Sequence, residues 1–139
     1  MIYDDVEQAV IKAVKPHIPS GVNVSWPNSE LTTKGERWLD IDNLFVDDRV
    51  ITTGDKGENE IRGILQILVK IKPNIGGKSA LSLATRLAKQ FKAGKSFTHN
   101  QAHVIFRGAT PGPAFTSGEY YTVPLSVNYY SRYSRTLGD

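Results

Sequence analysis

The stretch that decides the fold is residues 61–72, with the sequence IRGILQILVKIK. Five large apolar residues share one face of an extended chain with a glycine at position 63: Ile61, Leu65, Ile67, Val69 and Ile71. The positions between them include Arg62, Gln66 and Lys70, so the period of two predicts a β-strand with one buried face. Ile64 and Leu68 indicate that the second face is also covered in part.

The segment before it, residues 37–48 (RWLDIDNLFVDD), alternates in the same way. We therefore predict that 37–48 and 61–72 pair as one long β-hairpin. The connection between them, residues 49–60 (RVITTGDKGENE), contains the glycine and aspartate residues that are typical of an exposed turn. It is expected to project beyond the sheet as an arm.

Two segments have apolar residues at helical spacing and predict amphipathic helices, over residues 2–15 and 78–93. The apolar stripe of the first helix comprises Ile2, Val6, Ala9, Val10, Ala13 and Val14. The stripe of the second comprises Ala80, Leu81, Ala84, Leu87, Ala88 and Phe91. Each stripe needs an apolar partner, so both helices are expected to cover one side of the sheet.

Shorter strands are predicted over residues 22–26, 103–107 and 119–130, with a Gly/Pro-rich loop over 108–118. Pro124 favours an edge position or a bulge in the last strand, because proline has no N–H to donate.

The expected fold class is therefore α+β. A mostly antiparallel sheet is built on the long β-hairpin, with two helices packed on one side, in the order α-β-β-β-α-β-β. Residues 1–139 are expected to form one domain, since 139 residues is a common domain size. Residues 131–139 are polar and basic and are expected to be a flexible tail.

Composition excludes several classes of protein. Hydrophobic residues make up 40% of the chain and charged residues 22%, as in ordinary folded proteins. The absence of cysteine excludes disulfide scaffolds, thiolate metal sites and cysteine nucleophiles. No run approaches the roughly 20 apolar residues of a membrane-spanning helix, and the acidic N-terminus differs from a secretory signal. The cytoplasm is the default compartment.

The net charge of +3 hides an uneven distribution. Residues 1–60 hold six basic and twelve acidic residues, giving −6, whereas residues 61–139 hold eleven basic and two acidic residues, giving +9. Such asymmetry is typical of nucleic-acid contacts or of subunits that attract one another head to tail. It is equally compatible with two halves that neutralise each other inside one domain.

Candidate chemical motifs lack parts that their chemistry needs. Residues 74–79 (NIGGKS) end like a phosphate-binding loop, but Lys72 stands where that loop requires its first glycine. His99 and His103 have the spacing of a helical metal site, but they are expected to span a loop and a strand, where their rings diverge. We therefore expect no catalytic residue, no cofactor, no metal and no enzymatic activity.

Protein interfaces are the expected functional surfaces. The projecting arm is acidic, and the C-terminal segment combines tyrosine with arginine, which are enriched at interfaces. The candidate interface residues are Asp47, Asp48, Arg49, Asp55, Lys56, Glu58, Glu60, Tyr130, Arg132, Tyr133 and Arg135.

Several landmarks follow one another along most of the chain: IYDDVEQAVIKAV, VSWPN, RWLDIDNLF, GILQILVKI, LATRLAKQF and TVPLSVNYY. In this order they resemble the tail terminator, or tail completion, proteins of long-tailed bacteriophages. Each landmark is a pattern rather than a catalytic signature.

The resemblance implies a virion structural protein that assembles in the host cytoplasm. Such proteins form a ring, usually a hexamer, on the head-proximal end of the tail tube, where they stop tube polymerisation and present a surface for head joining. The implied partners are other copies, the tail tube protein and head-tail connector proteins, with no membrane and with DNA passing through the ring without sequence-specific binding.

Two alternatives stay open. One is a neck or connector-side completion protein of similar size. The other is a small nucleic-acid-binding domain without sequence specificity that uses Lys70, Lys72, Arg86, Lys89 and Lys92.

Overall fold

The computed structural model describes residues 2–19, 21–27, 35–54, 56–72 and 77–135. In this part of the chain, two α-helices, one 3₁₀ turn and seven strands form an α+β fold. In chain order the elements are α1 (Ile2–Val14), η1 (Lys15–His17), β1 (Asn23–Ser25), β2 (Arg37–Val50), β3 (Glu58–Ile71), α2 (Gly77–Gln90), β4 (Ser96–His99), β5 (Ala102–Pro111), β6 (Phe115–Ser117) and β7 (Tyr120–Ser134).

The described strands form one mixed sheet in the order β1-β2-β3-β7-β5-β4, and β6 adds to β7. All pairings are antiparallel except that of β1 with β2, which is parallel. The sheet is therefore mostly antiparallel, as expected, with one parallel pairing at β1.

The predicted hairpin is formed by β2 and β3, with Ile41 opposite Ile67. Alternate residues of β3 from Ile61 to Ile71 are buried, as the sequence predicted, and Ile67 and Val69 lie on the same face. Ile64 and Leu68 on the other face are half-buried. The hairpin is longer than predicted, because Arg49, Val50 and residues 58–60 belong to the paired strands.

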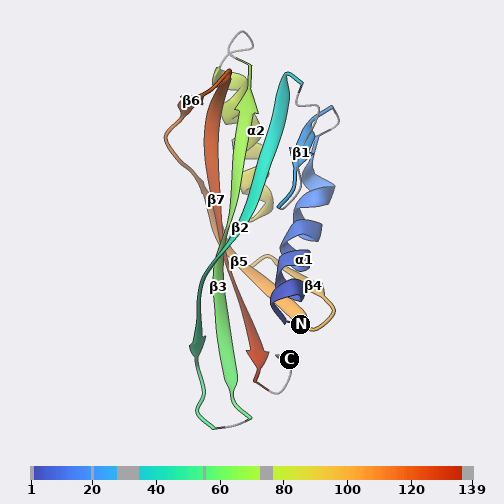
Figure 1. The fold of residues 1–139 in the computed structure, drawn as a ribbon, viewed down its shortest axis with the longest axis vertical. Coiled ribbons are helices and arrows are strands. Elements are labelled where there is room, and N and C mark those ends of the chain that lie inside the picture. Colours follow the sequence, from blue (N-terminus) through green and yellow to red (C-terminus); the bar gives the residue numbers. More distant parts are fainter. Residues whose placement is uncertain (1, 20, 28–34, 55, 73–76, 136–139) are drawn as a thin grey trace.

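Both helices pack on one face of the sheet, as Figure 1 shows for α2 behind the strands. All six predicted apolar residues of α1 are buried. In α2, Leu81 is 52% exposed and Leu83 is buried in its place. Leu83 shares a helix face with Ala80, Ala84 and Leu87 at three- and four-residue spacings, and Leu81 falls outside that stripe.

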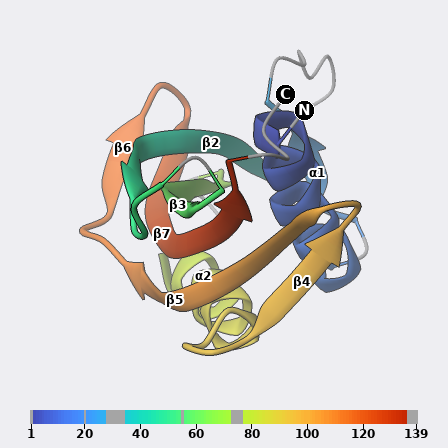
Figure 2. The ribbon, with the colours of Figure 1, turned by 90° about the horizontal axis from the view of Figure 1, so that it is seen from below.

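The sheet curls so that α1 contacts β4 and β5 on one side and reaches β2 on the other (Figure 2). On one side, Glu7 accepts a hydrogen bond from Asn43 of β2. On the other side, Lys12 lies 3.0 Å from the Nδ1 atom of His99 in β4, and Asp5 accepts a hydrogen bond from Asn100. Helix α1 thus bridges β2 and β4 across the curled sheet.

Four strand assignments differ from the sequence prediction. β4 and β6 were not predicted, and β5 continues to Pro111 through part of the expected loop. β7 runs to Ser134, so residues 131–134 pair with β3 rather than belonging to a tail. The remaining tail residues 136–139 lie outside the described residues.

Pro124 lies in β7, which is an inner strand, but the sheet has a local edge beside it. The ladder with β5 ends opposite Leu125, and the ladder with β6 begins opposite Thr122. The missing N–H of Pro124 falls at this gap, while its carbonyl accepts a hydrogen bond from Gly112. The sheet therefore accommodates the proline without losing a ladder bond.

Candidate contact surfaces

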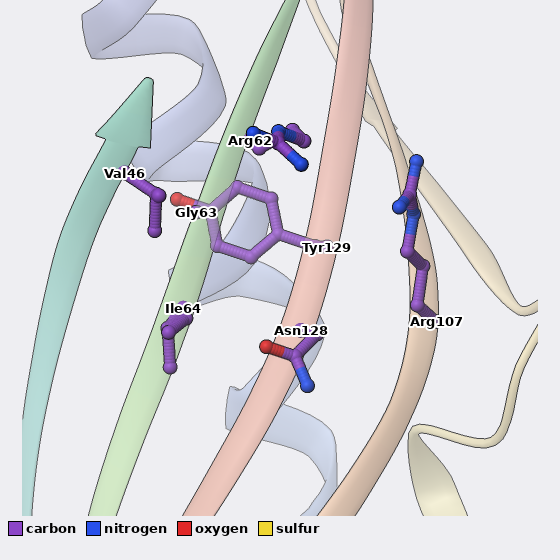
Figure 3. A pocket seen from close by; sticks show the side chains of 7 residues that line it. All are labelled: Val46, Arg62, Gly63, Ile64, Arg107, Asn128 and Tyr129. Carbon is purple, nitrogen blue, oxygen red and sulfur yellow. The ribbon is translucent and has the colours of Figure 1, made fainter.

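Two β-bulges bend the sheet at one level. Val46 is the extra residue of β2 opposite β3, and Arg107 is the extra residue of β5 opposite β7. They flank the pair Gly63–Tyr129 in the two central strands. Because a bulge bends its strand, the outer face of the sheet, which is the face turned away from the helices, is hollowed here. The depression has a volume of about 370 Å³ and is lined by Val46, Arg62, Gly63, Ile64, Arg107, Asn128 and Tyr129 (Figure 3).

Tyr129 explains the glycine at position 63. Its ring lies across Gly63, where any Cβ atom would collide with the ring and its hydroxyl (Figure 3). The hydroxyl donates a hydrogen bond to Oδ1 of Asn43, which ties β7 to β2 over the intervening β3. Burial raises the pKa of Tyr129 well above its ordinary value.

Glu60 is the centre of an ionic cluster on the outer face. Its carboxylate is 1% exposed and lies 3.2 Å from Arg49, 3.5 Å from Arg107 and 3.2 Å from Arg132. The three guanidiniums come from β2, β5 and β7 and are each about half exposed. The guanidiniums of Arg107 and Arg132 also lie over the ring of Tyr130, at 4.4 and 5.7 Å from its centroid. The prediction that Glu60 is exposed on the arm is wrong, because three arginines from neighbouring strands enclose it.

Asp47 and Asp48 point to opposite faces. Asp47 pairs with Arg62 on the outer face, and the hydrogen bond from Arg62 lowers the pKa of Asp47. The Val46 bulge reverses the alternation of β2, so Asp48 lies opposite Ile61, on the side of the core. Strict alternation from position 37 would have placed Asp48 on the outer face.

Asp48 joins three elements through hydrogen bonds. Its Oδ2 accepts from the hydroxyls of Tyr3 in α1 and Tyr133 in β7, both at 2.6 Å. Its Oδ1 accepts from Asn59 of β3 at 3.1 Å. The hydrogen bond to Asp48 raises the pKa of Tyr3 to about 12, and burial, followed by the same carboxylate, raises that of Tyr133. Asp48 and Tyr133, both predicted interface residues, therefore hold α1 to the hairpin.

Arg135 binds the arm of its own chain. Its guanidinium donates to the carbonyls of Thr52, Gly54 and Glu58 and to the side chain of Asn59. Its backbone N–H donates to the carbonyl of Gly57. Lys56 and Glu58 are exposed on the arm, and Asp55 lies outside the described residues.

Exposed apolar side chains gather on the distal half of β2. Of the seven large apolar side chains that are exposed in the described part of the chain, five lie within residues 44–51. They are Leu44, Phe45, Val46, Val50 and Ile51, with exposures between 37% and 61%. We call residues 44–51 the apolar segment. Its sequence signal is the run of three consecutive apolar residues, Leu44, Phe45 and Val46, which breaks the alternation of residues 37–43.

The lysines and arginines considered for nucleic-acid binding do not form one surface. Lys70 is buried on the outer face, with Nζ 5.2 Å from the ring centroid of Trp38. Arg86, Lys89 and Lys92 are exposed on or just after α2, on the opposite side of the sheet.

His99 and His103 lie on opposite faces of the β4–β5 hairpin, since His99 pairs with Ala102 and His103 with Thr98. Among the described residues no group of three His, Cys, Asp or Glu side chains could hold a metal ion. No helix in that part of the chain is long and apolar enough to cross a membrane. Residues 74–76, the start of the segment that ends like a phosphate-binding loop, lie outside the described residues.

Comparison with known proteins identifies the class. Residues 5–129 match the model of a family described as phage tail terminator protein. The match defines a structural protein of the phage tail, a component of the virion. The chain belongs to the phage tail terminator family.

Solved structures share the fold. One, whose title names no function, aligns with a TM-score of 0.78 and 22% identity over 96% of this chain and 97% of that chain. Another, from a structure titled as the virion of a native gene transfer agent particle, aligns with a TM-score of 0.57 and 9% identity over 95% of this chain and 98% of that chain. No curated protein matches the sequence.

Proposed function

We propose that the protein forms a ring, of six copies, on the head-proximal end of the tail tube. The ring stops tube polymerisation and presents the surface to which the head connector binds, and DNA passes through it without being read. The protein acts by contact alone, without catalysis or a bound cofactor, and assembles in the host cytoplasm. Membership of the tail terminator family supports this proposal.

The observation that carries the proposal is the exposure of the apolar segment. Five large apolar side chains in contact with water are costly, at roughly 25 cal/mol per Å² of apolar surface, and their concentration within residues 44–51 marks this strand segment as an interaction site. Within the described residues, β1 pairs only with residues 38–40 of β2, so the outer edge of the apolar segment has no strand partner. Such an edge can pair with a strand of another copy.

The contact between copies is heterologous, because a ring joins two different surfaces of neighbouring subunits. Most of the charged interface candidates already have partners within the subunit: Asp47, Asp48, Arg49, Glu60, Arg132 and Arg135. We therefore assign the contact between copies to the apolar segment, with exposed Lys56 and Glu58 at its rim.

The test compares two equally exposed apolar positions. Val46→Asp places a charge in the apolar segment, and Leu81→Asp places one on α2, where the parent side chain is 52% exposed against 56% for Val46. Both variants are expected to fold, as judged by thermal unfolding. Val46→Asp is expected to prevent ring formation and tube capping, seen as tails of irregular length in electron micrographs.

Leu81→Asp is expected to give tails of uniform length. Tails of uniform length from Val46→Asp would contradict the assignment of the apolar segment to the contact between copies. A protein that binds filled heads but never tail tubes would instead favour the neck-side alternative.

A further inference from the structure

The outer face of the sheet carries an unbalanced cluster of guanidiniums. Arg49, Arg107 and Arg132 surround the single carboxylate of Glu60, which gives this cluster a formal charge of +2. Arg62 is neutralised by Asp47. The exposed Glu58 lies two residues before Glu60 on the same strand. The formal charge of the cluster stays positive when Glu58 is included.

Each arginine keeps donors for another partner. A guanidinium has five N–H groups, and the contact with Glu60 uses one nitrogen of each arginine. The side chains of Arg49, Arg107 and Arg132 are 52%, 46% and 56% exposed, so the remaining donors face solvent. Glu60 thus holds three cations together while leaving most of their hydrogen-bonding capacity free.

The cluster is also held in place before any ligand binds. Tyr130 lies beneath the guanidiniums of Arg107 and Arg132, and Glu60 anchors both from the side. The bulge at Arg107 brings this residue towards the cluster from β5. Fixing long side chains in advance removes part of the entropy cost of binding.

The guanidiniums converge although their strands lie apart. The arginines lie on β2, β7 and β5, with β3 between the first two, so the cluster draws on four adjacent strands. Arg49 and Arg107 lie 3.2 and 3.5 Å from one oxygen of Glu60, and Arg132 lies 3.2 Å from the other. A phosphate group, which has several oxygens, can accept hydrogen bonds from more than one of these guanidiniums. Arginine forks match phosphate oxygens in two-point contacts.

We propose that Arg49, Arg107 and Arg132 bind the phosphodiester backbone of nucleic acid, with Asn128 and Arg62 at the adjoining depression. The proposal rests on the proposed function in one respect, that double-stranded DNA passes by this protein and is the natural source of the phosphates. Contact is made to the backbone and not to base edges, so binding is independent of sequence. In a ring, the outer face of the sheet would then be turned towards the DNA.

The test measures binding of the full chain to fluorescent duplex DNA over a range of salt concentrations. The double variant Arg107→Gln/Arg132→Gln removes two charges from the outer face, and the matched control Arg86→Gln/Lys89→Gln removes two from α2. Removing two phosphate contacts is expected to weaken binding at least about tenfold at low salt and to reduce the slope of log K against log salt by about 2. The α2 control is expected to keep the parent slope.

Equal losses of DNA affinity in both double variants would show that binding depends on the total charge and not on one site. A loss of affinity in the α2 variant alone would place the site on α2. Polyglutamate that competes as well as DNA would assign the cluster to an acidic protein instead. Each of these results overturns the proposal, as does the absence of DNA binding by both the free protein and protein-capped tails. If the double variant unfolds, Arg49→Gln is measured in its place, with an expected slope change of about 1.

Tube capping by the double variant separates the two proposals. If the double variant still caps tubes but no longer binds DNA, both proposals are supported. If the wild-type chain binds DNA but never caps tubes, the arginine cluster remains assigned to DNA and the ring proposal is contradicted.

Discussion

At the scale of single residues, Gly63 sets the path of the central strands, because Tyr129 occupies the space of its missing side chain. Gly63→Ala is expected to force the Tyr129 ring out of its position and to break its hydrogen bond with Asn43. Overpacking of this kind costs about 1–3 kcal/mol of unfolding free energy. Urea denaturation measures the loss.

Replacing the tyrosine as well, in Gly63→Ala/Tyr129→Leu, tests the cause. If the collision explains the loss, the two changes together destabilise less than the sum of the single changes. Strict additivity would mean that the glycine is required for its backbone alone.

Glu60 and Glu58 differ in their burial, which gives another prediction for single residues. They lie two positions apart on β3, but Glu60 is buried among three arginines and Glu58 is exposed. Glu60→Gln leaves guanidiniums facing a neutral amide, and loss of charged hydrogen bonds costs about 1.5–3 kcal/mol. Glu58→Gln is expected to change stability by less than about 0.5 kcal/mol. Similar midpoints for both variants in chemical denaturation would contradict the buried ionic cluster.

At the scale of elements, α1 is joined to the hairpin by tyrosine hydroxyls that hydrogen-bond Asp48. The pKa of Tyr3 is raised to about 12, so the folded protein keeps a proton that the unfolded chain loses near pH 10. The unfolded state therefore binds fewer protons in this window, and stability is expected to fall as the pH rises from 10 towards 12. Tyr3→Phe is expected to make this decline shallower.

Asp48→Asn serves as the complementary variant, since it keeps the shape of the acceptor but removes its charge. The pKa of Tyr3 is then expected to move back towards its ordinary value, which absorbance of the tyrosinate reports directly. An unchanged titration would show that the Asp48 carboxylate is not the cause.

The elements that the sequence predicted well are those with a long local period. The hairpin strands and the stripe of α1 repeat every two or 3.6 residues, so each reveals its buried face without knowledge of the rest of the fold. β4 and β6 have only four and three residues, too few for a period to emerge. In α2, Leu81 was assigned to the stripe in place of Leu83, although the three- and four-residue spacings to Ala80, Ala84 and Leu87 favour Leu83, which is the buried one.

The candidate surfaces were harder to predict because their causes are not local. A bulge adds one residue to a strand without changing its composition. The bulge at Val46, which reverses the alternation of β2 and turns Asp48 towards the core, therefore could not be predicted from the sequence. Glu60 looks like an ordinary turn residue, and its partners Arg107 and Arg132 are 47 and 72 positions away along the chain. Arg135 reads as part of a basic tail, yet it binds the arm.

At the scale of the whole molecule, acidic residues from the first half of the sequence meet basic residues from the second. Glu60 meets Arg107 and Arg132, and Asp47 meets Arg62. These two carboxylates are thus paired within the subunit, and the surface proposed for contact between copies is the apolar segment. Association of copies and binding of DNA therefore rest on different forces.

Salt is expected to separate these two associations. At about 1 M salt the Debye length is about 3 Å, which suppresses exposed charge interactions but leaves apolar burial intact. Self-association, followed by sedimentation velocity, is therefore expected to persist there. DNA binding through three phosphate contacts has an expected slope of about −2.7, so it weakens roughly 40-fold between about 50 and 200 mM salt. Arg107→Gln/Arg132→Gln is expected to remove only the second association. Rings that dissociate over the same salt range as the DNA complex would show that charges, and not the apolar segment, hold the copies together.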